Sequence, residues 1–140
     1  MLETPTPRLL YKAPGVEIAH LQKENAVLVT LTGFLGAEKY KEQAMAQIRV
    51  AEKCKSKSLV YDLRNFKIIP PEAQQWTDSV WRPLALKAGI RWGAVIMPED
   101  VFGSSTVEKV VDSIQQNKDA VIYSYFDKVE DAYEWVAKRK

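Results

Sequence analysis

Hydrophobic and polar residues alternate with a period of two along the start of the chain. Two such runs, 16–21 and 26–31, flank four polar residues, which predicts a pair of antiparallel strands joined by a turn. A shorter run, 8–12, precedes them and stops at Pro14-Gly15, a turn signal. The chain is therefore predicted to begin with an antiparallel three-stranded meander.

After Gly36 the hydrophobic period lengthens to about 3.6 residues, which predicts an amphipathic helix. Its apolar stripe consists of Ala37, Tyr40, Ala44, Ile48 and Ala51. Three further β-rich runs follow, each of them short enough for one strand, at 58–63, 92–97 and 121–126. The run 92–97 is apolar almost throughout, which is typical of a central strand covered on both faces.

Helix boundary signals separate these later strands. A second helix is expected to begin near Pro71, to bend at Pro83 and to end at Gly89. Ser105-Thr106-Val107-Glu108 fits a capping box and predicts the start of a third helix, and Asp127 with Glu130 is expected to cap a last one.

The predicted order is β-β-β-α-β-α-β-α-β-α. Helices between successive later strands imply right-handed crossovers and parallel pairing. The expected fold is α/β, with a mixed sheet, antiparallel at its N-terminal strands and parallel in its C-terminal half, flanked by four helices. Residues 1–7 are expected to form a flexible arm, and residues 8–140 a single domain.

Composition narrows the classes of partner. The 140 residues carry a net charge of only +2, scattered along the chain, which does not indicate nucleic-acid binding. No apolar run has the roughly twenty residues of a membrane span, and no signal pattern opens the chain, so we expect a cytoplasmic protein. With one cysteine, Cys54, and one histidine, His20, we expect no metal, no cofactor and no nucleophilic triad.

Several short motifs, taken with the element order, carry a family resemblance. They are Tyr61-Asp62-Leu63-Arg64-Asn65, Pro71-Glu72, Gln75-Trp76, Met97-Pro98-Glu99-Asp100-Val101-Phe102-Gly103, and Tyr125-Phe126-Asp127 before Glu130, Ala132 and Trp135. From about Val16 to Val136 the chain resembles the bacterial SpoIIAA-like family. That resemblance implies a fold similar to STAS domains and to the CRAL-TRIO lipid carriers.

The resemblance does not bring the STAS phosphorylation switch with it. STAS anti-sigma-factor antagonists carry an Asp-Ser-Ser-Gly run with a phosphorylated serine at the start of the helix after the corresponding strand. The matching stretch here is Pro70-Pro71-Glu72-Ala73, which has no hydroxyl group. Glu72 can at most mimic a permanent negative charge.

Two places are candidates for ligand binding. The first is the rim formed by the carboxyl ends of the parallel strands, where ligands of open α/β sheets usually bind. It should bring together Asp62, Arg64, Asn65, Pro98, Phe102, Ser104 and Ser105. An ion pair between Asp62 and Arg64, and ordinary capping by the serines, are the structural alternatives.

The second place is the bent helix, which contains Trp76 and Trp81. Trp76 follows the apolar spacing of Ala73, Val80 and Leu84, whereas Trp81 is one position off and is expected to project outward. An outward tryptophan would suit a homodimer surface or the wall of an apolar pocket, and core packing is the alternative.

These features favour a noncatalytic SpoIIAA-like module that binds a small apolar or amphipathic ligand and self-associates. A regulatory protein-interaction domain that docks a partner through residues 70–81 is the second hypothesis. The third is a small enzyme that acts on an anionic substrate at Arg64, Ser104 and Ser105.

Overall fold

The computed structural model describes residues 7–99, 101–117 and 119–139, with residues 101 and 102 described by their backbone alone. Residues 1–6 of the predicted arm and the side chain of Phe102 therefore lie outside the described part of the chain. A six-stranded sheet has the order β1-β2-β3-β5-β7-β8. Its strands are β1 (Arg8–Ala13), β2 (Val16–Leu21), β3 (Ala26–Leu31), β5 (Ser58–Asp62), β7 (Trp92–Ile96) and β8 (Ile122–Phe126).

The pairing of the strands confirms the predicted mixed sheet. The β1–β2 and β2–β3 pairs are antiparallel, and the three remaining pairs are parallel. Antiparallel neighbours need only a turn between them, whereas each parallel pair is joined by a crossover that contains a helix. The α/β class and the predicted element order are both confirmed.

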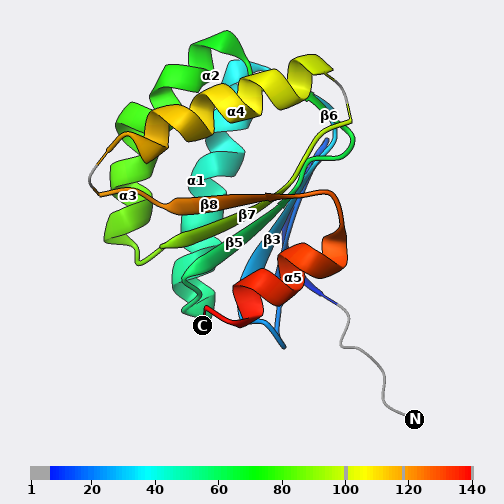
Figure 1. Ribbon diagram of the computed structural model, residues 1–140, viewed down its shortest axis with the longest axis vertical. Coiled ribbons are helices and arrows are strands. Elements are labelled where there is room, and N and C mark those ends of the chain that lie inside the picture. The colour runs from blue at the N-terminus through cyan, green and yellow to red at the C-terminus, as the bar shows by residue number, and fades with distance from the viewer. Residues whose placement is uncertain (1–6, 100, 118, 140) are drawn as a thin grey trace.

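Helices cover both faces of the sheet, as Figure 1 shows. One face carries α1, α2, α3 and α4, and in the part of the chain that the structure describes the opposite face carries α5. The bounds are α1 (Ala37–Cys54), α2 (Pro71–Trp76), α3 (Arg82–Lys87), α4 (Val101–Gln115) and α5 (Val129–Ala137). No helix in the described residues is long and apolar enough to cross a bilayer.

Strand alternation divides the core into two parts. On β3, Val27 and Val29 face α1 and belong to the larger cluster, whereas Ala26 faces the other way and belongs to the smaller cluster under α5. The neighbouring strand β5 alternates in the same manner, with Leu59 in the larger cluster and Val60 in the smaller one. The larger cluster, between the sheet and α1–α4, is the part of the fold in which an internal site can form.

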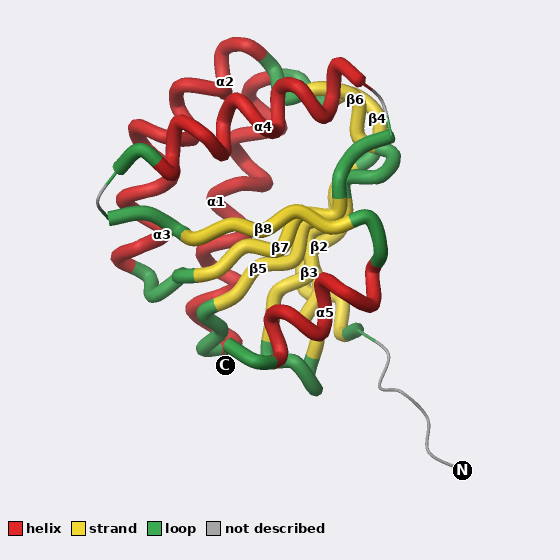
Figure 2. The backbone as a smooth tube through the Cα atoms, in the orientation of Figure 1, coloured by secondary structure: helices red, strands yellow, loops and turns green. Residues whose placement is uncertain are grey.

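A second, two-stranded sheet was not predicted. Its strands β4 (Gly33–Phe34) and β6 (Phe66–Ile68) pair in parallel, at one end of the main sheet (Figure 2). Runs of two and three residues are too short to show a period of two, so the pattern could not reveal them.

The second helix is interrupted by a π-helical turn. This segment, η1 (Thr77–Trp81), joins α2 to α3, and the amide of Arg82 donates to the carbonyl oxygen of Thr77, five residues earlier. Pro83 follows directly, and it cannot donate a backbone hydrogen bond and crowds the preceding turn. We expected a bend at Pro83, and the structure has a π-helical segment that ends just before Arg82-Pro83. Gly89, with φ of 100°, follows the end of α3 as expected.

Two predicted helix caps are wrong. α4 begins at Val101, so Ser105 and Thr106 lie inside the helix, where the Thr106 hydroxyl donates to the carbonyl of Gly103 and accepts from the amide of Ile69. That hydroxyl fastens α4 to the chain after β6 and does not cap a terminus. α5 has Lys128 at its N-cap with no side-chain cap bond, so Asp127 lies outside the helix.

Candidate ligand-binding cavity

The predicted rim contains a bidentate ion pair between Arg64 and Asp62. The Nε and Nη2 atoms of Arg64 lie 2.9 and 2.8 Å from the two carboxylate oxygens of Asp62. The hydrogen bond and the charge of Asp62 raise the pKa of Arg64 above its ordinary value. The structural alternative for these two residues is confirmed, and the cation of Arg64 is neutralised within the rim.

The structure joins part of this rim through its backbone. The amide of Leu63 donates to the carbonyl of Ile96, and the amide of Glu99 donates to the carbonyl of Arg64 at 3.4 Å. Asn65 is exposed, and its carbonyl accepts from the amide of Gly33. The ends of β5 and β7 are therefore closely tied.

The remaining predicted rim residues lie along the next segment. Pro98 is buried, Ser104 is half-buried and Ser105 is exposed, both serines lying within the first turns of α4. The structure thus brings Asp62, Arg64 and the chain next to Pro98 together, and it assigns the serines to a helix.

A cavity of about 50 Å³ lies in the larger core cluster, between the sheet and the helices on its more heavily covered face. Its walls come from the sheet, from α1, from η1, from α4 and from the segment after β5. The lining residues are Leu31, Tyr40, Ala44, Gln47, Tyr61, Leu63, Phe66, Ile69, Thr77, Trp81, Val95, Val107, Val110, Val111, Ile114 and Tyr123.

Two tyrosines from the sheet form part of this lining. Tyr61 on β5 and Tyr123 on β8 are separated by β7, yet their ring centroids are only 6.4 Å apart. Gly93 on β7 makes this approach possible, because a Cβ at that position would lie 2.5 Å from the Tyr123 ring. The missing side chain of Gly93 lets the Tyr123 ring lie across the central strand.

A directional chain of hydrogen bonds leads away from the cavity. The Tyr61 hydroxyl donates to Oε1 of Gln47 at 2.8 Å, and Nε2 of Gln47 donates to Oε1 of Gln43 at 2.7 Å. Nε2 of Gln43 is buried and has no hydrogen-bond partner among the described residues. In both of these hydrogen bonds the donor lies nearer the sheet, so each proton is directed toward α1.

The tyrosine hydroxyls lie in a strongly desolvated environment. Burial raises the pKa of Tyr40 to about 12, although a hydrogen bond with Thr77 opposes the shift. Burial likewise raises the pKa values of Tyr61 and Tyr123, whose hydroxyls also interact with each other. The three phenols are therefore neutral at physiological pH.

The expectation that Trp81 projects outward is wrong. Trp81 is 1% exposed, and its indole N–H donates to the carbonyl of Ala44 on α1 at 2.8 Å. A π-helix has more residues per turn than an α-helix, so the 3.6-residue spacing gave the wrong face for a residue at the end of η1. Trp76 is half-buried on α2, with the Lys41 ammonium 5.7 Å from its ring centre.

Sequence reasoning missed the polar members of this lining. Tyr40 was expected on the buried stripe of α1, but Gln47, Thr77 and Tyr123 were not singled out, and Tyr61 was named only within a family motif. Gln47 gave one usable signal, since it lies three residues after Ala44 and four before Ala51, on the apolar stripe of the helix. A long polar side chain on a buried helix face normally needs a buried partner.

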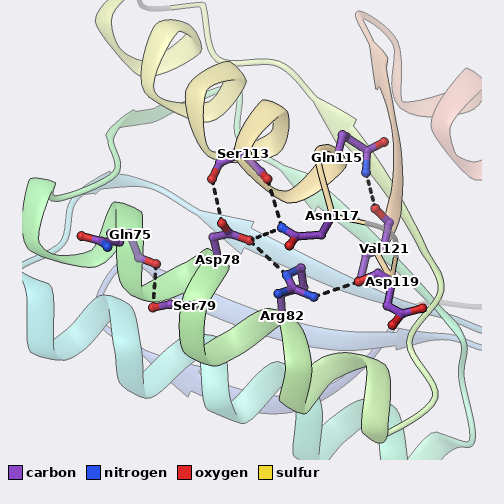
Figure 3. Close-up of polar contacts among 9 residues, drawn as sticks. All are labelled: Gln75, Asp78, Ser79, Arg82, Ser113, Gln115, Asn117, Asp119 and Val121. Atoms are coloured by element: carbon purple, nitrogen blue, oxygen red, sulfur yellow. Dashed lines mark hydrogen bonds and ion pairs between the residues drawn. The ribbon is translucent and has the colours of Figure 1, made fainter.

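A cluster of polar side chains fastens η1 to α4 next to the cavity (Figure 3). One carboxylate oxygen of Asp78 accepts from Arg82 at 3.0 Å and from Asn117 at 3.1 Å, and the other accepts from Ser113 at 2.8 Å. Arg82 also donates to the carbonyl of Asp119. Because both η1 and α4 line the cavity, this Asp78 cluster holds two of its walls together.

Comparisons with known proteins found no match for this chain among protein-family models, curated proteins or solved structures. The mixed α/β sheet rests on the structure itself, and the SpoIIAA-like resemblance stays a prediction from the sequence. In the described residues no three His, Cys, Asp or Glu side chains gather as a metal site would require.

Proposed function

We propose that this chain is a noncatalytic SpoIIAA-like module that binds a small, largely apolar molecule in the cavity beneath α1, η1 and α4. The observation that supports this most is the cavity, whose apolar walls surround a few grouped polar atoms. Binding sites for small molecules commonly combine these two properties. The π-helix in one wall supports the proposal further, because π-turns often occur at functional sites.

Recognition fits these side chains better than chemistry does. A phenol whose pKa is raised by burial is a poor nucleophile and a poor general base at neutral pH, which applies to Tyr40, Tyr61 and Tyr123. The guanidinium of Arg64 is paired with Asp62, which weakens the case for an anionic substrate at the rim. The cavity is therefore proposed to hold its ligand unchanged.

Xenon is a suitable first probe, because it is a single apolar atom that enters small dry cavities. We expect xenon NMR to reveal one saturable site in the wild type. Val111→Leu adds one carbon inside the cavity and should remove that site, whereas Val129→Leu adds one carbon under α5 and should leave it intact. Absence of the site from the wild type, or its persistence in Val111→Leu, would contradict the proposal.

Self-association is a second proposed property, and an exposed pair of apolar residues favours it. Val80 on η1 is 41% exposed and Leu84 on α3 is 39% exposed, four positions apart on one helical segment. Since Trp81 is buried, a homodimer surface on the bent helix would centre on this pair. Sedimentation velocity should show a concentration-dependent dimer that Val80→Ser/Leu84→Ser abolishes and Phe34→Ser, at another exposed site, does not. A wild-type monomer at all concentrations would refute it.

A further inference from the structure

We propose that the cavity selects a neutral hydroxyl compound of a few non-hydrogen atoms, whose O–H group donates to a phenolic oxygen of the Tyr61–Tyr123 pair. This inference rests on the proposed binding function and specifies its ligand class. Three properties of the cavity lead to it: its volume, the charge of its lining and the direction of its hydrogen bonds.

The volume limits the size of the guest. A water-sized group needs about 10–15 Å³ of cavity volume, and the cavity measures about 50 Å³. Roughly three or four non-hydrogen atoms therefore fit without rearrangement. A long acyl chain would require η1 and α4 to separate.

The lining disfavours a charged guest. The described residues that line the cavity include no lysine, arginine or histidine, so an anion would have no countercharge. They include no aspartate or glutamate either, which leaves a cation equally unpaired. An unpaired buried charge is far more costly than a neutral polar group with one hydrogen bond.

The direction of the hydrogen bonds decides between donor and acceptor. The proton of Tyr61 is used by Gln47, and the next proton along the chain is used by Gln43. The hydroxyls of Tyr61 and Tyr123 share a hydrogen bond, in which Tyr123 is the donor because the Tyr61 proton is already used. With both protons in use, the pair offers the cavity an acceptor lone pair, because a phenol can accept while it donates. A guest with an O–H group can use that lone pair, whereas a ketone of the same shape cannot.

Four probes with the same number of non-hydrogen atoms separate these possibilities: 2-propanol, acetone, acetate and 2-methylpropene. In protein-detected NMR titrations of the wild type, we expect 2-propanol to bind about fivefold more tightly than acetone, the ratio that one net hydrogen bond provides. Acetate should show no saturable binding. Equal affinities for 2-propanol and acetone, or saturable binding of acetate in the cavity, would overturn the ligand class.

Two tyrosine variants locate the effect. Tyr61→Phe keeps the ring and removes the oxygen, so 2-propanol should lose its advantage over acetone while 2-methylpropene still binds. Tyr125→Phe is the matched control, because Tyr125 is 40% exposed on β8 and is not among the lining residues, and the advantage should persist. If Tyr61→Phe does not fold, Gln47→Met serves the same purpose, because it releases the Tyr61 proton for a carbonyl guest and should again remove the advantage of 2-propanol.

The two proposals fail in different ways. If 2-methylpropene binds the wild type but no hydroxyl preference is seen, the cavity is a binding site and only the ligand class is wrong. If neither xenon nor any of the four probes binds, the proposed function itself is wrong.

Discussion

Gly93 is the residue on which the arrangement of the sheet tyrosines depends. Its backbone is ordinary strand, and its importance is steric, because it lies beneath the ring of Tyr123. The sequence placed Gly93 inside a nearly continuous apolar strand, and Tyr123 on the neighbouring strand. Nothing in either run indicated that the two would be registered opposite each other, since register is a property of pairing in space.

Gly93→Ala should therefore be strongly destabilising in the presence of Tyr123 and much less so in its absence. A Cβ at 2.5 Å from a ring atom cannot be accommodated without displacing the ring. We expect a loss of about 1–3 kcal/mol in the free energy of unfolding, the usual range for overpacking. In a Tyr123→Ala background the same substitution should cost only a fraction of that. Urea denaturation of the four proteins of this double-mutant cycle measures the difference, and additive effects would contradict the contact.

The buried tyrosines also predict how stability depends on pH. The pKa of Tyr40 is raised from 10.0 to about 12, and those of Tyr61 and Tyr123 are raised as well. Below pH 10 both folded and unfolded states keep these protons; above it only the unfolded chain releases them. Their contribution should therefore be constant up to about pH 10 and be lost as the pH rises toward 12.

Each such tyrosine contributes a slope of about 1.4 kcal/mol per pH unit, so three contribute roughly 4 at most. The last phase of phenol ionisation, followed by ultraviolet absorbance, should coincide with unfolding followed by circular dichroism, because these three buried phenols ionise only in the unfolded chain. Tyr40→Phe should reduce the slope by about 1.4 kcal/mol per pH unit. Phenol ionisation that reaches completion while the circular dichroism of the folded protein persists would show that these hydroxyls are accessible to solvent.

At the scale of elements, η1 and the start of α4 are the features that sequence patterns described least well. The apolar pattern with Pro83 predicts a bent helix, but a period of 3.6 cannot represent the π-turn that precedes Pro83. It therefore assigned Trp81 to the surface, although its indole is hydrogen-bonded to α1. The capping box failed because α4 begins earlier, at Val101, and the Thr106 hydroxyl accepts from the amide of Ile69, after β6. In both places contacts with segments distant in the sequence override the local motif.

The Asp78 cluster should control how readily these two walls separate. Asp78→Ala leaves Ser113, Asn117 and the side chain of Arg82 without their shared acceptor. We expect a loss of about 1–3 kcal/mol in the free energy of unfolding, together with faster exchange of bound xenon. Line widths in xenon NMR report the exchange rate.

Ser79→Ala is the control for the Asp78 variant. Within the described part of the chain, the Ser79 hydroxyl donates to the carbonyl of Gln75 in the same helical segment, as Figure 3 shows, and makes no bond that connects η1 to α4. Its removal should leave the exchange rate of xenon close to that of the wild type. A similar acceleration in both variants would mean that general helix fraying, and not the Asp78 cluster, limits access to the cavity.

For the molecule as a whole, the architecture was predictable and the site was not. Periods of two and of 3.6 are properties of single segments, and the order of those segments with short crossovers leaves few topologies. The cavity instead arises where α1, η1, α4 and the strands β3, β5, β7 and β8 fail to fill the space among them. Tyr61 and Tyr123 were predicted correctly as strand residues, but which hydroxyls gather at one point depends on packing that no single segment encodes.

The whole-molecule prediction concerns the stability cost of keeping this cavity. Empty space in a core destabilises by about 24 cal/mol per Å³, so a cavity of about 50 Å³ corresponds to roughly 1 kcal/mol. Val111→Leu, which adds one carbon there, should therefore raise the free energy of unfolding by up to about 1 kcal/mol. The same variant should lose the stabilisation that 2-propanol gives the wild type, because the ligand stabilises only a fold that binds it. Calorimetric scans with and without 2-propanol measure both effects, with Val129→Leu as the matched addition under α5. A Val111→Leu protein that is less stable than the wild type would contradict the expected gain from filling the cavity. Stabilisation of Val111→Leu by 2-propanol would show that the ligand is held elsewhere.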